Sequence, residues 1–142
     1  MRETEWTGEL LAHAQSVGAV YLAVVGSEMQ QPGWPDRYLS HVLWHGWVEF
    51  KGQRTVIEPL QVKRMKELNM RRPGSAWVVR HGPSPLCALV QTPDGETRAT
   101  CIANTYRQLL ALVIVRIYEL SHGVIDVDKS REAMWKVING TS

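Results

Sequence analysis

The chain contains little cysteine: two residues in 142, Cys87 and Cys101, with no Cys-x-x-Cys pair. Zinc sites built on cysteine clusters use such closely spaced pairs, so the sequence does not support a zinc site of that kind. We predict that both cysteines are reduced thiols. The net charge is also small, at +2. This mildly basic balance permits a nucleic-acid partner without arguing strongly for one, because dedicated DNA-binding domains are often more basic.

Long apolar runs are absent as well. The longest run, Leu109–Val115, is far too short to span a bilayer, and the acidic N-terminal stretch at residues 1–5 carries no apolar core of a signal peptide. No internal repeat or low-complexity segment is visible. We therefore expect a cytoplasmic protein without a membrane partner. A length of 142 residues predicts one domain, spanning residues 1–142, that is large enough to bury a hydrophobic core.

The first part of the chain alternates helical and extended patterns. The elements that these patterns predict are a helix at 5–16, strands at 20–25, 37–44 and 47–51, a helix at 59–71 and a strand at 76–79. Pro59 suits the first position of a helix. A tight turn at His45-Gly46 would join the second and third strands as an antiparallel hairpin. The order helix, strand, strand, strand, helix, strand predicts an α/β fold with a mixed sheet flanked by helices.

The remaining residues, 83–142, form an extension with a less regular pattern. The elements expected there are strands at 86–90 and 96–102, a helix at 104–120 and a short helix at about 129–138. The run Leu109–Val115 is apolar all round if it is helical, and such a helix is buried in its own core or against another copy. The pattern leaves both arrangements open, and in the second a homodimer would form through residues 104–138.

Three charged residues form a constellation in the first part of the chain: Asp36, Glu49 and Lys51. Side chains alternate along a strand, so Glu49 and Lys51 share one face, while Val48 and Phe50 point to the other and can pack. Two charged side chains on an otherwise apolar strand are costly to bury without partners, and a metal site supplies partners. With a turn at residues 45–46, Asp36 lies beyond simple pairing range and needs a bend in the chain to reach them.

These residue types fit the hydrolysis of a phosphodiester. Mg²⁺ is a hard cation that is often held by one or two carboxylates together with water and phosphate, and Asp36 and Glu49 would supply the carboxylates. The ion polarises the phosphate and lowers the pKa of its bound water. Lys51 would orient the nucleophile and stabilise developing negative charge. The alternative is an ion pair on a solvated strand, with Asp36 in a turn, because Glu-x-Lys alone is a common pattern.

The sequence resembles the PD-(D/E)xK nuclease superfamily, and within it the branch of virus-type replication-repair nucleases called VRR-NUC. The resemblance rests on Gly33-Trp34-Pro35-Asp36-Arg37, on Val48-Glu49-Phe50-Lys51-Gly52 and on Pro59-Leu60-Gln61. It covers about residues 3–82. It implies a restriction-endonuclease-like core of the order α-β-β-β-α-β, to which residues 83–142 add a helical C-terminal extension.

The resemblance also implies an active site. Its residues would be Asp36, Glu49, Lys51, Gln61 and Glu5. Lys51 corresponds to the catalytic lysine, and Gln61 to a further active-site residue of the branch. The metal ligands would be Asp36, Glu49, the backbone carbonyl of Phe50, and Glu5.

The glutamate on the first helix is the least certain of these matches. By its distance to Gly18, Glu5 is the better match, and Glu9 is the reserve. The two lie four residues apart and share a helix face, so the sequence does not separate them firmly.

The activity that the resemblance implies is a DNA endonuclease that uses Mg²⁺ or Mn²⁺. It could act on branched or junction DNA in phage replication, recombination or repair, with a phage or its bacterial host as the source. One rival is a DNA-binding or assembly module that kept the fold and lost the activity, although all core residues are present. A second rival is an unrelated α/β enzyme with an accidental Glu-x-Lys pair, which would bind no divalent metal.

Four residues are candidates for contacts with DNA: Trp34, Arg37, Lys63 and Arg64. Trp34 lies in a loop rich in glycine and proline and could stack on a base. It is bulkier than the usual residue of the family at this position, which bears on substrate access. The cations could contact phosphates, and their alternative role is an ordinary solvated helix face.

Overall fold

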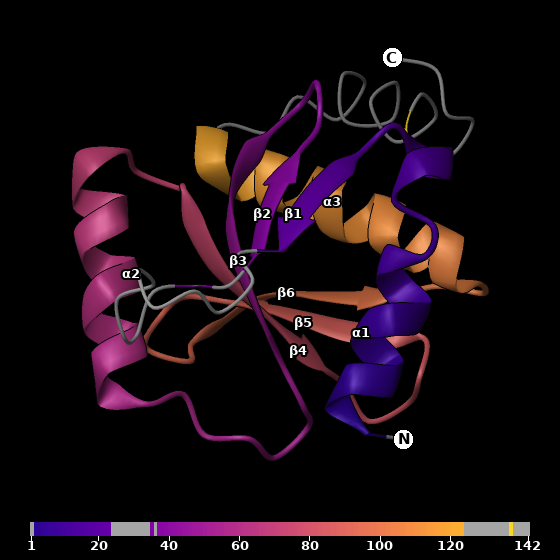
Figure 1. Ribbon diagram of the computed structural model, residues 1–142, viewed down its shortest axis with the longest axis horizontal. Helices are drawn as coiled ribbons and strands as arrows, with labels where there is room; N and C mark the ends of the chain where they lie inside the picture. Colours follow the sequence, from indigo (N-terminus) through magenta and orange to yellow (C-terminus); the bar gives the residue numbers. More distant parts are fainter. Residues whose placement is uncertain (1, 24–34, 36, 124–136, 138–142) are drawn as a thin grey trace.

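The computed structural model describes residues 2–23, 35, 37–123 and 137 (Figure 1). Within these residues the elements follow in the order α1 (Glu3–Leu11), η1 (Gln15–Val17), β1 (Val20–Ala23), β2 (Arg37–Ser40), β3 (His45–Lys51), α2 (Pro59–Arg71), β4 (Ala76–His81), β5 (Cys87–Gln91), β6 (Thr97–Ile102) and α3 (Tyr106–His122). The order and type of the elements agree with the sequence prediction, including the strands and the helix after residue 83.

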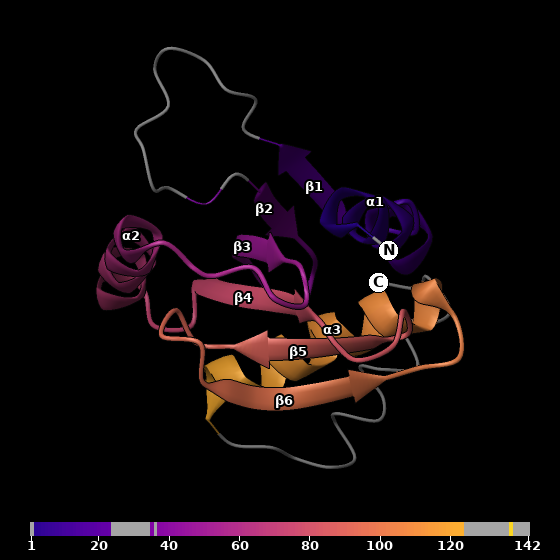
Figure 2. The same ribbon diagram turned by 90° about the horizontal axis from the view of Figure 1, so that it is seen from below.

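The strands form one mixed sheet in the order β1-β2-β3-β4-β5-β6 (Figure 2). Strands β3 and β4 are parallel, and the other neighbouring pairs are antiparallel. Parallel neighbours need a crossover connection, which is usually a helix, and α2 supplies it here. The predicted mixed sheet is therefore confirmed, and β5 and β6 extend it beyond residue 83.

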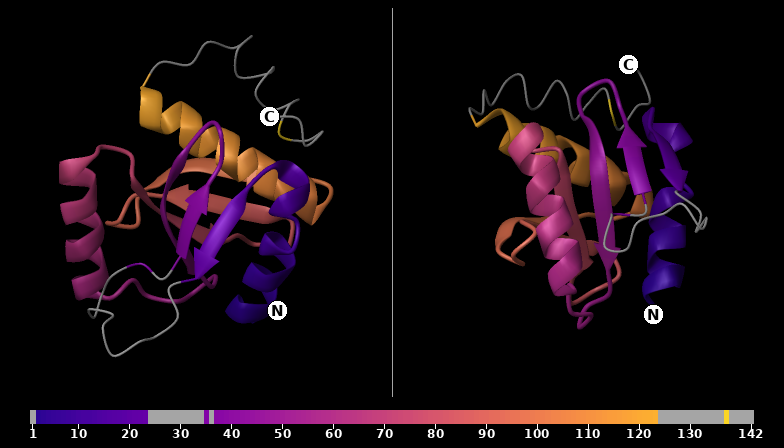
Figure 3. Two further views of the ribbon diagram at one scale, coloured as in Figure 1. Left: turned by 45° about the horizontal axis from the view of Figure 1, so that its top comes forward. Right: turned by 60° about the vertical axis from the view of Figure 1, so that its left-hand side comes forward.

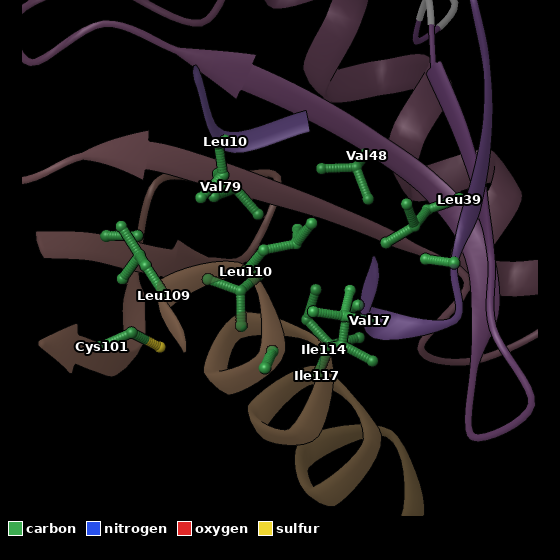
Figure 4. Packing of buried hydrophobic residues seen from close by; sticks show 14 of the residues in the cluster. Leu10, Val17, Leu39, Val48, Val79, Cys101, Leu109, Leu110, Ile114 and Ile117 are labelled. Atoms are coloured by element: carbon green, nitrogen blue, oxygen red, sulfur yellow. The ribbon is translucent and has the colours of Figure 1, made fainter. Parts of the chain in front are cut away.

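One side of the sheet carries the larger core. Alternate residues of β3 and β4, among them Val48 and Val79, face α1 and α3 on this side. Figure 4 shows Leu110 and Ile114 of α3 pointing toward these strands. The apolar residues 109–111 and 113–115 of α3 are buried, as predicted, in the protein's own core. Burying these side chains is the main stabilising contribution to the fold.

The opposite side of the sheet is covered by α2 (Figure 3). Met65 is completely buried there against Ala76 and Val78, with Trp47 and Leu68 packed around them. This smaller core fixes α2 over β3 and β4. The residues of β3 that share the Trp47 face therefore lie next to this helix.

The turn between β2 and β3 does not lie where the sequence predicted it. The chain turns at residues 41–44, with Ser40 opposite His45, while His45 and Gly46 belong to β3. The His41 ring holds the turn, because its Nδ1 accepts from the backbone N–H of Leu43 at 3.0 Å and its Nε2 lies 3.0 Å from the carbonyl oxygen of Val17. Gly46 serves close packing instead, since a Cβ there would meet the Ser75 carbonyl oxygen at 2.5 Å.

The first helix also differs from its predicted bounds of 5–16. Helix α1 begins at Glu3 and ends at Leu11, and the 3-10 helix η1 follows it. Two acidic residues in the first turn, Glu3 and Glu5, favour the earlier start because they complement the positive end of the helix dipole. Gly18 ends the segment in the left-handed region, with a φ of 79° that glycine adopts without strain.

The predicted helix at 129–138 lies outside the described residues, apart from Val137, which is buried against the larger core. Among the described residues, no helix has both the length and the apolar character needed to cross a membrane.

Candidate active site

Strand β3 presents a row of four functional side chains toward the α2 side of the sheet. These are His45, Trp47, Glu49 and Lys51, which share one face because strand side chains alternate. Glu49 and Lys51 are each only 7% exposed. The alternative for this pair placed it on a solvated strand, and this burial contradicts that placement. Buried charges of this kind need partners, and the neighbouring elements supply them.

Three of the predicted site residues come together here. The Nζ of Lys51 lies 3.6 Å from the Oε1 of Glu49. The Nε2 of Gln61, in the first turn of α2, donates to the same Glu49 oxygen at 3.2 Å. The Oε1 of Gln61 accepts from the backbone N–H of Glu58 at 3.3 Å and so caps the helix. Gln61 thus ties the start of α2 to the Glu49 carboxylate.

The local sequence explains why α2 begins at this point. Pro59 occupies the first turn, where its missing N–H removes no helical hydrogen bond. The N-terminal end of α2 carries partial positive charge and lies beside Glu49 through Gln61. An anionic group is therefore favoured between Lys51 and the start of this helix.

The cluster offers one ligand of the kind that hard divalent cations take. Such ions take oxygen ligands, and the Glu49 carboxylate is an oxygen ligand held in place by an amide and an ammonium group. Among the described residues no group of three or more His, Cys, Asp and Glu side chains lies together. Asp36, the second predicted carboxylate, and Trp34 lie outside the described residues. Their neighbour Arg37 pairs with Val48, immediately before Glu49 in the chain.

The role of the first-helix glutamates, Glu5 or Glu9, stays a prediction. Glu5 and Glu9 are exposed, and no hydrogen bond or ion pair within the described residues joins either to Glu49 or Lys51. A third glutamate of this helix, Glu3, has a contact near the end of β3. Its Oε2 accepts from the Oγ1 of Thr55 at 3.3 Å, in the loop that follows Lys51.

The sequence offers Arg80 only as one of several basic residues that could contact phosphates, and its structural role was not predicted. It lies on β4 opposite Lys51. Its Nη1 donates to the carbonyl oxygens of Gly52 at 2.9 Å and Thr55 at 2.6 Å, and its Nε donates to Gln91 at 3.0 Å. Partial burial lowers the pKa of Arg80, and the nearby charge of Glu3 opposes that shift. The available signal was its place as the only Lys or Arg in the apolar β4 sequence.

The three described candidates for DNA contact are dispersed. Arg37 pairs with Val48, and this register turns its side chain toward the α1 and α3 side, away from Glu49. Lys63 is exposed on α2. Arg64 is half-buried and pairs with Glu67 at 3.3 Å.

No protein-family model matches the chain, and no curated protein matches it. Among solved structures, the chain is similar to Hjc, a Holliday junction resolvase from the archaeal hyperthermophile Archaeoglobus fulgidus. The TM-score is 0.50 at 14% sequence identity, over 71% of this chain and 87% of that chain. At this identity the similarity concerns the fold. It confirms the predicted restriction-endonuclease-like α/β core, and α3 adds the predicted helix after it.

Proposed function

We propose that this chain is a metal-dependent nuclease that hydrolyses DNA phosphodiester bonds, with branched or junction DNA as its substrate class. The cluster of Glu49, Lys51 and Gln61 carries the proposal. A carboxylate and an ammonium group lie 3.6 Å apart, almost fully buried, at the start of a helix. The fold similarity to a Holliday junction resolvase supports the nuclease activity and the branched substrate.

Glu49, Asp36 and the backbone carbonyl of Phe50 would hold Mg²⁺ or Mn²⁺. The bound ion would supply Lewis-acid polarisation of the phosphate and a more acidic water. Lys51 stabilises the negative charge that develops on the phosphate and helps to orient the attacking water. Gln61 holds the Glu49 carboxylate in one orientation, and this preorganisation favours ion binding.

The glutamate of the first helix is proposed to be Glu3 rather than Glu5 or Glu9. Glu3 contacts Thr55 in the loop after Lys51. It also lies close enough to Arg80 for its charge to oppose the lowering of the Arg80 pKa. Glu5, the match favoured by sequence spacing, is exposed. A carboxylate at Glu3 would complete the acidic side of the site.

The assignments to a branch, a source and an oligomeric state rest on the sequence pattern. We propose that the chain is a single nuclease domain of the VRR-NUC branch, from a phage or its bacterial host, and that it acts as a homodimer. The apolar side of α3 is occupied by the protein's own core. Two copies would therefore meet through the half-buried side of α3 or through residues 124–138.

The test is a cleavage assay on labelled single-stranded, duplex, flap and four-way-junction DNA with Mg²⁺, Mn²⁺ or EDTA. Lys51→Ala is expected to abolish metal-dependent cutting. Lys66→Ala is the matched control, because Lys66 is an exposed lysine on α2 whose partner is Asp94. Wild-type protein that cuts none of these DNAs with either metal would contradict the proposal and favour a DNA-binding module.

A further inference from the structure

A second polar cluster lies on the same sheet face as the proposed active site, at the other end of β3. Tyr38 of β2 pairs with Trp47 of β3 and therefore shares the face of Glu49. The Tyr38 hydroxyl is hydrogen-bonded to Nδ1 of His45. Arg72, directly after α2, donates to the His45 carbonyl oxygen at 2.8 Å and contacts its Nε2 at 3.4 Å.

The direction of these hydrogen bonds can be assigned. A guanidinium group only donates, so Nε2 of His45 is an acceptor in its contact with Arg72. An imidazole that accepts at Nε2 carries its proton at Nδ1, which then donates to the Tyr38 oxygen. The proton of the Tyr38 hydroxyl is left to donate elsewhere. Within the described part of the chain, His45 is the only hydrogen-bond partner of that hydroxyl.

This chain of hydrogen bonds begins at the Arg72 guanidinium group and ends at the Tyr38 hydroxyl group. Both ends favour an anionic oxygen, because Arg72 is exposed and positively charged, and because Tyr38 is only half-buried. Trp47 packs edge-on against the Tyr38 ring, with the ring centroids 5.2 Å apart, and lies between His45 and Glu49 along the strand. The cluster lies two to four residues along β3 from Glu49, or roughly 7 to 14 Å.

We propose that Tyr38, His45 and Arg72 form a phosphate-binding site for the DNA strand that is cut, at a phosphate flanking the cleaved one. The inference rests on the proposed nuclease function, since His45 and the Glu49–Lys51 pair lie on one face of the same strand. Arg72 supplies charge to the flanking phosphate, and the Tyr38 hydroxyl donates a hydrogen bond to it. The site positions the substrate and takes no part in bond breaking.

The test measures DNA binding in EDTA, where no cleavage occurs, over a range of salt concentrations. Arg72→Gln is expected to reduce the slope of log K against log salt by about one, as expected for one lost phosphate contact. Tyr38→Phe keeps the ring and removes only the hydroxyl, and should weaken binding about tenfold. The controls are Arg98→Gln, on an exposed arginine paired with Glu96, and Tyr21→Phe, on an exposed tyrosine of β1.

A scan with neutral methylphosphonate linkages assigns the contact. One position near the cut should weaken binding of the wild type and leave Arg72→Gln unaffected. Equal binding by Arg72→Gln and Arg98→Gln, with equal binding by both tyrosine variants, would overturn this inference, even if the protein cleaves DNA. Weakened binding by Arg72→Gln and Tyr38→Phe in a protein that never cleaves would uphold the site and refute the nuclease.

Discussion

Replacing Arg80 with glutamine should show how much the hydrogen bonds around the proposed site contribute to the stability of the protein. Arg80 makes three hydrogen bonds, to the carbonyl oxygens of Gly52 and Thr55 and to the Gln91 side chain. At about 1 kcal/mol each, their loss amounts to about 3 kcal/mol. The bond to Thr55 is exposed, which reduces the expected destabilisation to about 2–3 kcal/mol. Urea denaturation of Arg80→Gln measures this loss of stability. In the control variant Arg98→Gln the free energy of unfolding should change by less than about 0.5 kcal/mol.

The loss of activity should exceed what partial unfolding explains. Arg80 fixes the loop from Gly52 to Thr55, and Thr55 holds the Glu3 carboxylate. Arg80→Gln should therefore reduce metal-dependent cleavage at temperatures where the variant is folded, and Glu3→Gln should reduce it similarly. If the two residues act through one loop, the double variant will cleave DNA no more slowly than the less active of the two single variants. Rate losses that multiply in the double variant would refute this reasoning.

Two further predictions concern groups outside the site. Burial lowers the pKa of His41 from 6.5, so the unfolded chain binds a proton before the folded protein does as the pH falls. The contribution of His41 to the free energy of unfolding should decrease as the pH falls below 6.5. The stability lost between neutral and mildly acidic pH should therefore be smaller in His41→Asn, and equal pH profiles of the two proteins in urea melts would rule this out. Burial raises the pKa of Cys101 to about 12, so its thiol should react with a disulfide reagent at pH 8 only after unfolding. Rapid labelling of Cys101 in the folded protein would contradict that.

Much of the fold could be predicted because its signals are local. The apolar spacing of α2 and α3 and the alternation along β3 follow from the periods of helices and strands. The same alternation places Glu49 and Lys51 on one face, and the sequence predicted this. The burial of the pair depends on α2, which crosses over the face that the pair shares.

The errors arise where contacts between distant residues decide. Gly46 resembles a turn residue, but the Ser75 carbonyl oxygen, nearly 30 residues away, requires a glycine inside the strand. His41 holds the turn through Val17, which no local pattern indicates. The first helix was predicted to begin at residue 5, but α1 begins at Glu3, whose side chain contacts Thr55 in the loop after β3.

The two hydrogen bonds of Gln61 restrict which residues this position can accept. Its carbonyl oxygen caps α2, while its amide nitrogen donates to Glu49. Glutamate could cap the helix but could not donate while ionised, and lysine could donate but could not cap. An amide of this length does both at once. A substitution at position 61 would therefore affect both the start of α2 and the orientation of the Glu49 carboxylate. A substitution that is accepted during evolution would need a compensating substitution at a neighbouring position.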